Sequence, residues 1–154
     1  MFIKALITTL ALSATALGLG QAIVINRCDF PVYITSVDHE PHDTLTLASG
    51  RVWVEPQRVD PVTGISIKVT TTSTGLWNAS PVLQLAYTAA PDPWIYYDLS
   101  TVYGFDPKFV GKTITLGANA PDAPDRIVWH GSPEPFQNTK GYRGYTDLTL
   151  TLCH

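Results

Sequence analysis

The sequence has few cysteines, few basic residues and no long apolar segment after its first twenty residues. Of its 154 residues only 2 are cysteine, 10 are Lys or Arg and 13 are Asp or Glu, so the net charge is −3. Nucleic-acid binding depends on clustered Lys and Arg, and the chain has no such cluster, so we expect no nucleic-acid partner. It also lacks a G-x-S-x-G motif and a glycine-rich phosphate loop, which argues against serine-hydrolase and nucleotide chemistry.

Sustained helical periodicity with capping residues is also absent. Short β-prone runs occur instead at intervals of about ten residues, a spacing typical of a β-sandwich. The clearest of them alternate apolar and polar side chains, as a half-buried strand does. We therefore predict an all-β fold, a single antiparallel β-sandwich domain. The predicted strands are 22–25, 32–37, two strands flanking a turn at Ser49-Gly50 within 44–55, 65–70, 82–88, 94–98, 112–116, 126–129 and 147–152.

Residues 1–20 have the features of a secretory signal peptide. Lys4 gives a positive start, residues 5–12 form an apolar run, and small residues follow it. The run is too short to span a bilayer and hydroxyl residues interrupt it, which disfavours a membrane anchor. We expect cleavage to leave residues 21–154 as one secreted, extracellular domain, monomeric and without membrane attachment.

The two cysteines, Cys28 and Cys153, lie at the ends of the first and last predicted strands. A pair of cysteines in an exported chain predicts one disulfide, because the extracellular compartment is oxidising. The bridge would enclose about 125 residues, and the chain-entropy model then gives about 5 kcal/mol as an upper figure for its contribution. The alternative is a pair of buried free thiols.

Two histidines, His39 and His42, lie in the polar segment 38–43. Histidines three residues apart beside acidic residues raise the question of a metal site. Pro41 prevents a helix that would align the two imidazole rings, and the sequence shows no third ligand. We therefore favour a solvated turn, with no metal and no cofactor.

Three segments, taken in order, resemble the thaumatin-like proteins. INRCDFPVYITSV (25–37) has the family's Asn-x-Cys step, then an aromatic and a Val-aromatic pair, and LASG with Trp53 resembles its hairpin. YDLSTVYGFD (97–106) is similar to its Tyr-Asp-hydrophobic-Ser-x-Val-x-Gly-Phe segment, and a cysteine near the C-terminus completes the pattern. The match is closest to a small, cysteine-poor fungal branch, the blastomyces yeast-phase-specific protein family. It implies a β-sandwich with Cys28 bridged to Cys153 and a second lobe reduced to the loop after Phe105.

In thaumatin-like proteins, glucan binding and weak hydrolase activity are attributed to acidic residues of an inter-lobe cleft. The resemblance places Asp98 at one of these positions, but Ala86 at the position of a family Glu. Glycoside hydrolysis needs two carboxylates, so we predict no catalytic residue. For Asp98 we favour a structural role, in which its carboxylate accepts hydrogen bonds from the backbone of a turn at 99–101. The candidates for a second acid are Asp92, Glu55 and Asp106.

Trp94 and Tyr96 would lie on one face of the strand 94–98, with Ile95 and Tyr97 on the other. An exposed pair would form a platform on which sugar rings stack, whereas a buried pair would belong to the core. Strand aromatics are usually buried, so we favour the core interpretation. Together with Asp98, these two residues remain the candidate ligand-binding residues.

These observations predict a secreted, non-catalytic protein that acts at the fungal cell wall or the host surface and binds polysaccharide or a host protein. One alternative is a weak β-glucan hydrolase that uses Asp98 and a second acid. Another is a structural or phase-associated secreted protein. A second carboxylate close to Asp98 in a cleft would favour the hydrolase.

Overall fold

The computed structural model describes residues 18–135 and 138–154. The segment 1–17, which contains most of the predicted signal peptide, lies outside the described residues. Within the described ranges, neither of the two short helices has the length and apolar character needed to cross a membrane.

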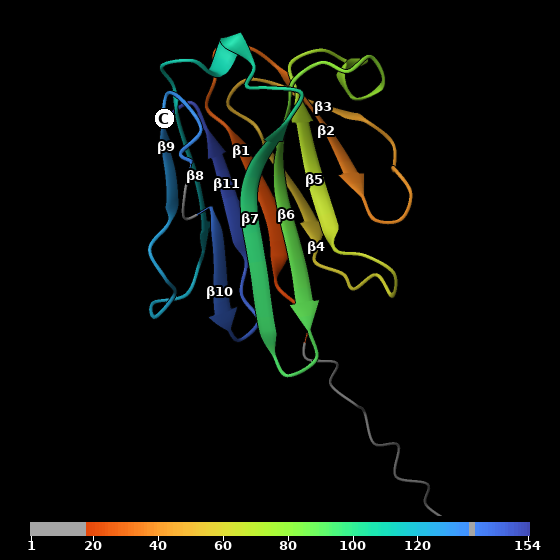
Figure 1. The fold of residues 1–154 in the computed structure, drawn as a ribbon, viewed down its shortest axis with the longest axis vertical. Helices are drawn as coiled ribbons and strands as arrows, with labels where there is room; N and C mark the ends of the chain where they lie inside the picture. The colour runs from red at the N-terminus through yellow and green to blue at the C-terminus, as the bar shows by residue number, and fades with distance from the viewer. Residues whose placement is uncertain (1–17, 136–137) are drawn as a thin grey trace, which may run out of the picture.

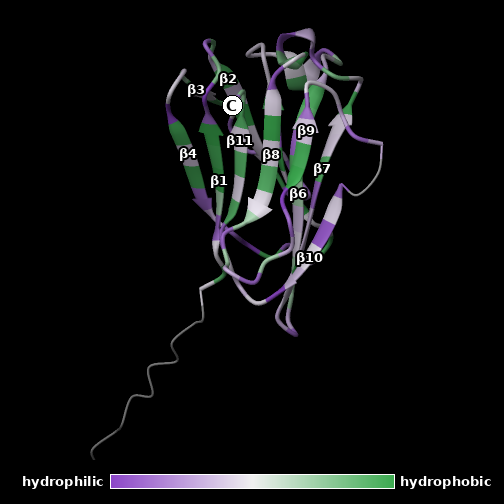
Figure 2. Ribbon diagram, turned by 90° about the vertical axis from the view of Figure 1, so that its left-hand side faces the viewer, coloured by the Kyte–Doolittle hydropathy of each residue, from purple (hydrophilic) through white to green (hydrophobic). Residues whose placement is uncertain are grey.

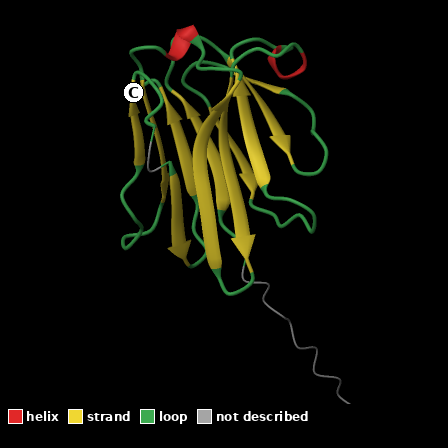
Figure 3. Ribbon diagram, in the orientation of Figure 1, coloured by secondary structure: helices red, strands yellow, loops and turns green. Residues whose placement is uncertain are grey.

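Two β-sheets pack face to face (Figures 1 and 3). Strands β1 and β11 pair in parallel, and the other neighbouring strands pair antiparallel. The predicted single β-sandwich is therefore confirmed. Sheet A has the order β4 (Val52–Pro56), β1 (Gln21–Asn26), β11 (Leu148–Leu152), β8 (Thr113–Ala118), β9 (Ile127–His130). Sheet B has the order β10 (Thr139–Arg143), β7 (Trp94–Val102), β6 (Val82–Ala90), β5 (Ile65–Thr70), β2 (Val32–Val37), β3 (Leu45–Leu47).

Alternation of side chains along each strand builds the core between the sheets. In β5, Ile65, Ile67 and Val69 are at most 2% exposed, whereas Ser66 and Lys68 point to the outer face. Each fully buried aliphatic side chain of this kind contributes about 1.5–3 kcal/mol relative to exposure. The inner strands of sheet A are correspondingly apolar, and the edge strand β10 is largely polar (Figure 2).

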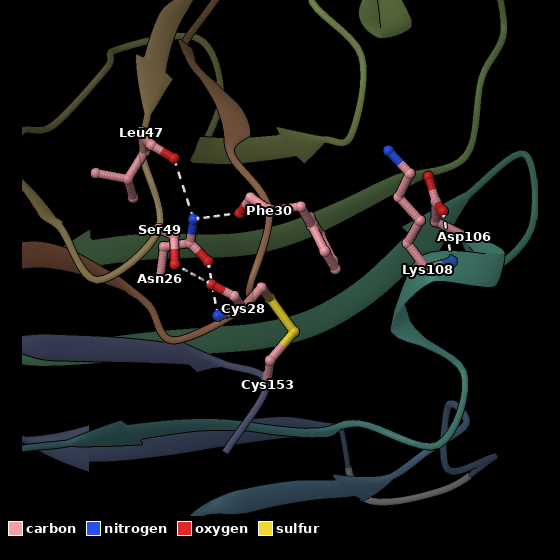
Figure 4. The surroundings of a disulfide bond; sticks show 8 residues. All are labelled: Asn26, Cys28, Phe30, Leu47, Ser49, Asp106, Lys108 and Cys153. Atoms are coloured by element: carbon pink, nitrogen blue, oxygen red, sulfur yellow. Dashed lines mark hydrogen bonds between the residues drawn. A yellow bond between two sulfur atoms is a disulfide. The ribbon is translucent and has the colours of Figure 1, made fainter.

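The parallel pairing of β1 with β11 brings the two cysteines together. The register places Asn26 opposite Leu152, so the two parallel strands finish at the same end of sheet A. Cys153 directly follows β11 and Cys28 lies two residues after β1, and the two form a disulfide with Cα atoms 4.9 Å apart (Figure 4). The predicted bridge is confirmed, and it links segments 125 residues apart.

The buried side chain of Asn26 fixes the backbone beside the disulfide (Figure 4). Its amide nitrogen donates to the carbonyls of Phe30 and Leu47, each at 3.0 Å. Its oxygen accepts from the backbone N–H of Cys28, also at 3.0 Å. Asn26 therefore ties β1 to the segment entering β2 and to β3.

Two features of sheet B differ from the prediction. The predicted turn at 99–101 is wrong, because β7 continues to Val102 and the buried Leu99 pairs with Leu85 in the core. The chain turns instead at Tyr103 and Gly104, whose φ angles are both positive, 59° and 91°. Strand β10 is not among the predicted strands, because its sequence TKGYR does not alternate apolar and polar residues. Its strand conformation comes from pairing with β7, its neighbour in the sheet.

Two short 3-10 helices lie among the loops at the disulfide end of the sandwich: η1 (Gly75–Trp77) and η2 (Pro107–Phe109). The carboxylate of Asp106 caps η2 by accepting from the backbone N–H of Lys108 at 2.9 Å. Phe109, which ends η2, is buried in the core beside Phe30 and Phe105. The loop after Phe105, in which the resemblance placed the remnant of a second lobe, is thus a single turn that closes the sandwich.

Candidate functional site

An open groove of about 410 Å³ lies on the outer face of sheet B, the face turned to the viewer in Figure 1. We call it the sheet-B groove. Strands β5, β6, β7 and β10 form its floor, and the end of the β4–β5 loop forms one side. Its lining residues are Thr63, Gly64, Ile65, Ser66, Lys68, Gln84, Ala86, Tyr87, Thr88, Tyr96, Tyr97, Asp98 and Thr139.

The register of sheet B explains why the surface is hollow at this point. Ser66, Ala86, Asp98 and Thr139 are successive partners across β5, β6, β7 and β10. Ala86 is the smallest side chain of this row, so the middle of the sheet is left uncovered. Ala86, which the sequence resemblance to thaumatin-like proteins aligned with a Glu, therefore lies on the floor of the groove.

Asp98 lies in the middle of β7, partly buried, and not at a strand end. Its carboxylate accepts a hydrogen bond from the hydroxyl of Thr139 at 2.8 Å. The expected capping of a turn at 99–101 is wrong, because those residues belong to the strand and the N–H of Leu99 donates to Asn138 O at 3.0 Å. The side chain of Asp98 thus faces the groove and remains open to further hydrogen-bond donors.

A polar row next to Asp98 crosses three strands. Lys68 donates to the side-chain oxygen of Gln84 at 2.7 Å, and the amide nitrogen of Gln84 donates to the hydroxyl of Ser100 at 2.9 Å. Desolvation on this face lowers the pKa of Lys68 below its usual value. The groove therefore presents an oriented set of donors and acceptors in place of a concentrated charge.

Trp94 and Tyr96 lie on the same outer face as Asp98, at one end of the sheet-B groove. Their rings stack with centroids 5.8 Å apart and planes inclined by 9°. Tyr96 is 47% exposed, whereas Ile95 and Tyr97 on the opposite face are buried. The predicted division of the two faces is confirmed, and the preference for a core position of Trp94 and Tyr96 is wrong.

Gly141 of β10 makes room for this aromatic pair. It is the partner of Tyr96 across the β7–β10 ladder. A Cβ atom at this position would lie 3.1 Å from two carbons of the Tyr96 ring and 3.7 Å from the Trp94 ring. Because Gly141 has no side chain, both rings can lie over the edge strand β10. The two stacked rings therefore remain on the surface of the sheet.

None of the candidate second acids lines the sheet-B groove. Among the described residues that line it, Asp98 is the only carboxylate. Glu55 accepts from Ser36 at 2.7 Å and from Arg58 at 2.5 Å, and Asp106 caps η2. Asp92 belongs to the turn between β6 and β7. The pair of carboxylates that glycoside hydrolysis requires is not assembled by these residues.

The predicted turn containing His39 and His42 is exposed, as expected, but acidic groups surround it. His39 Nδ1 lies 2.5 Å from Asp60 Oδ2, a residue of the β4–β5 loop, and 3.5 Å from Asp38 Oδ1. The hydrogen bond to Asp60 raises the pKa of His39 above its usual value, and the same bond lowers the pKa of Asp60. The hydrogen bond from His42 and one from the backbone of Glu40 also lower the pKa of Asp38.

Sequence reasoning found Asp98, Trp94 and Tyr96 but missed Lys68, Gln84, Thr139 and Asp60. Lys68 and Gln84 carry a usable signal, because each is the polar member of an alternating strand. Thr139 and Asp60 carry none, because one lies in an unpredicted edge strand and the other in a loop.

The fold and the groove define a class: a single-domain β-sandwich closed by one disulfide, with an open polar groove and an aromatic pair on one sheet. The family model described as Bys1, Blastomyces yeast-phase-specific protein, matches residues 9–154, so the chain belongs to this family. The crystal structure of the protein elicitor MoHrip2 from Magnaporthe oryzae is similar, with a TM-score of 0.68 and 25% identity, over 88% of this chain and 99% of that chain. A comparison with curated proteins found no match.

Proposed function

We propose that the protein is secreted and non-catalytic, acts as a monomer at the fungal cell wall or the host surface, and binds a polysaccharide chain in the sheet-B groove. The observation that carries this proposal is the stacked outer-face pair of a half-buried Trp94 and an exposed Tyr96 beside a polar groove. Flat aromatic faces attract the apolar faces of sugar rings, and neighbouring polar groups fix their orientation by hydrogen bonds to hydroxyls.

The polar groups of the groove suit a neutral ligand. Asp98 and Gln84 provide acceptors, while Lys68 and Thr139 provide donors, and the only formal charges on these four side chains are one negative and one positive. A sugar hydroxyl both donates and accepts, so it can pair with either kind of group. A strongly acidic or basic polysaccharide would find no concentrated countercharge here.

A pull-down with insoluble polysaccharides tests the proposal. Purified protein is mixed with β-glucan, chitin and cellulose, and the fraction removed from solution is measured. We expect binding to at least one of these, and we expect Tyr96→Ala and Trp94→Ala to weaken it about tenfold, as the loss of an aromatic stacking contact implies. Ala86→Gln should also weaken it, because the longer side chain fills the floor of the groove.

Trp77→Ala is the matched control. Trp77 is 66% exposed but belongs to η1, outside the groove. Its loss should leave binding unchanged. Equal binding by wild type and the Tyr96, Trp94 and Ala86 variants would contradict a polysaccharide site in the groove.

The non-catalytic part of the proposal is supported by the presence of a single carboxylate among the described residues that line the groove. Purified protein should release no reducing sugar from β-glucan above a buffer blank. The competing hydrolase hypothesis would be favoured by turnover that Asp98→Asn abolishes.

A second function, as an elicitor, is favoured by the likeness to MoHrip2 over nearly the whole of both chains. An elicitor acts through recognition by a host, so its partner would be a host protein. Purified protein applied to host tissue should then induce a defence response. If Tyr96→Ala loses polysaccharide binding but keeps this response, the two functions use different surfaces.

We also propose that the family is a cysteine-poor branch of the thaumatin-like proteins. The shared features are a sandwich with its first and last strands bridged and a groove at the family's acidic positions, Ala86 and Asp98. An experimental structure whose strand order differs from that of thaumatin-like proteins would contradict this placement.

A further inference from the structure

A cluster of charged side chains lies at the side of sheet B, away from the groove floor, where the loop 38–43 meets the β4–β5 loop. The two loops are on the right-hand side of Figure 1. The cluster contains three carboxylates, Asp38, Glu55 and Asp60, and one guanidinium, that of Arg58, which forms ion pairs with Asp38 and Glu55. With neutral imidazoles, these four groups carry a net charge of −2.

The two carboxylates nearest His39 are largely removed from water. The side chain of Asp60 is 5% exposed and that of Asp38 is 11% exposed. Two carboxylates held this close repel each other unless a cationic group lies near them. Arg58 neutralises only the far oxygen of Asp38, Oδ2, at 3.1 Å.

One oxygen of each carboxylate is already fixed, which orients the other. Asp60 Oδ1 accepts from the backbone N–H groups of Val62 and Thr63, at 2.8 and 2.9 Å. Asp38 Oδ2 accepts from Arg58 and from His42, the latter at 2.7 Å. Asp38 Oδ1 accepts from the backbone N–H of Glu40 at 3.0 Å and lies 3.5 Å from His39 Nδ1, and Asp60 Oδ2 also faces His39 Nδ1. The ligand atoms of these three residues lie within 4.8 Å of one another.

We propose that Asp38, His39 and Asp60 bind a divalent transition-metal ion of the zinc type. Ligand atoms about 2.0–2.1 Å from a tetrahedral ion lie roughly 3.3 Å from one another. Asp38 Oδ1 and His39 Nδ1 are 3.5 Å apart, near this value, and the exposed His39 ring need withdraw from Asp60 by only roughly 1 Å. A dication also matches the net charge of −2 that the four charged groups carry.

The supporting residues have the roles that the groups around a metal site usually have. His42 and Arg58 donate to Asp38 Oδ2 and orient its other oxygen. The nitrogen of His39 selects late transition metals over Mg²⁺ and Ca²⁺, which prefer oxygen ligands only. The ion would join the loop 38–43 to the β4–β5 loop, which also contributes Thr63 and Gly64 to the sheet-B groove.

Calorimetric titration of the full protein with Zn²⁺, in a buffer that does not chelate metals, tests the proposal. We expect saturable binding of one ion in the micromolar range and a melting temperature that rises with Zn²⁺ concentration. Asp60→Asn and His39→Gln should each weaken binding at least about tenfold. Asp60→Asn retains an oxygen for Val62 and Thr63, so the loop should remain folded, which a circular-dichroism spectrum checks.

His130→Gln is the control, because His130 is an exposed histidine of β9, far from the cluster in the chain and on the other sheet. It should bind Zn²⁺ as wild type does, and excess Mg²⁺ or Ca²⁺ should not compete. The absence of saturable Zn²⁺ binding would overturn the proposal and leave the cluster as an ion-pair network. Undiminished binding by Asp60→Asn, or loss of binding only in His42→Gln, would overturn it as well.

Discussion

The side chain of Asn26 makes three hydrogen bonds in a fully buried position, to Cys28, Phe30 and Leu47. At about 1 kcal/mol net for each bond, Asn26→Ala should lower the free energy of unfolding by about 3 kcal/mol. For a domain of this size that lowers the melting temperature by about 10 °C. Asn78→Ala, at an exposed asparagine with only local contacts, is the control and should melt as wild type does. Equal melting of both variants in thermal denaturation would show that Asn26 does not hold these strands.

The role of Asp98 can also be tested at the residue scale. The hydrogen bond that its carboxylate accepts from Thr139 is exposed to solvent, so Asp98→Ala should cost less than about 1 kcal/mol of stability. Polysaccharide binding should fall, because the variant removes an acceptor from the groove. Thermal melts beside the pull-down measure both effects, and Thr139→Ser, which keeps the hydroxyl, is the control. A large loss of stability with unchanged binding would assign Asp98 a structural role.

At the scale of the element, the edge strand β10 shapes the aromatic platform. Gly141→Val places side-chain atoms where the rings of Tyr96 and Trp94 now lie. We expect the stacked pair to separate, with a changed near-ultraviolet circular-dichroism spectrum and a loss of polysaccharide binding comparable to that of Tyr96→Ala. The core should be unaffected, because β10 pairs only with β7 and Gly141 faces outward.

The control for that experiment must not disturb the backbone. Gly131→Ala is therefore unsuitable, because Gly131 has a positive φ of 82° and an added Cβ atom would lie 2.8 Å from the Cα atom of Gly111. Lys140→Ala is suitable, because it changes the neighbouring residue of the same strand. Its spectrum and binding should match those of wild type. A Gly141→Val protein that retains the wild-type spectrum would mean that the rings do not rest on β10.

For the whole molecule, the disulfide is the covalent link between the first and last strands. Cys153→Ala should lower the free energy of unfolding by about 2–5 kcal/mol, because the bridge closes a loop of 125 residues in the unfolded chain. Chemical denaturation of oxidised wild type, reduced wild type and the variant measures this. Reduced wild type and the variant should agree, and equal stability of all three would contradict the prediction.

The fold class, most strands and the pairing of the cysteines could be predicted from the sequence alone. The alternation of apolar and polar residues in stretches such as Ile65–Thr70 predicts which side chains face inward. The prediction holds in the structure because each sheet has one buried face. With only Cys28 and Cys153 in the chain, one intramolecular pairing was available. The resemblance to thaumatin-like proteins pointed to Asp98 and Ala86, which both line the sheet-B groove.

Long-range contacts determine where β7 ends, that β10 forms, and what surrounds Asp98 and His39. Leu99 continues β7 because its side chain fills the core, which overrides the local turn signal of LST. Trp94 and Tyr96 stay on the surface because Gly141 lies opposite them, 45 residues from Tyr96 in the chain. Asp60 reaches His39 across 21 residues. Such contacts depend on loop paths and on strand order, which the local pattern of polar and apolar residues does not specify.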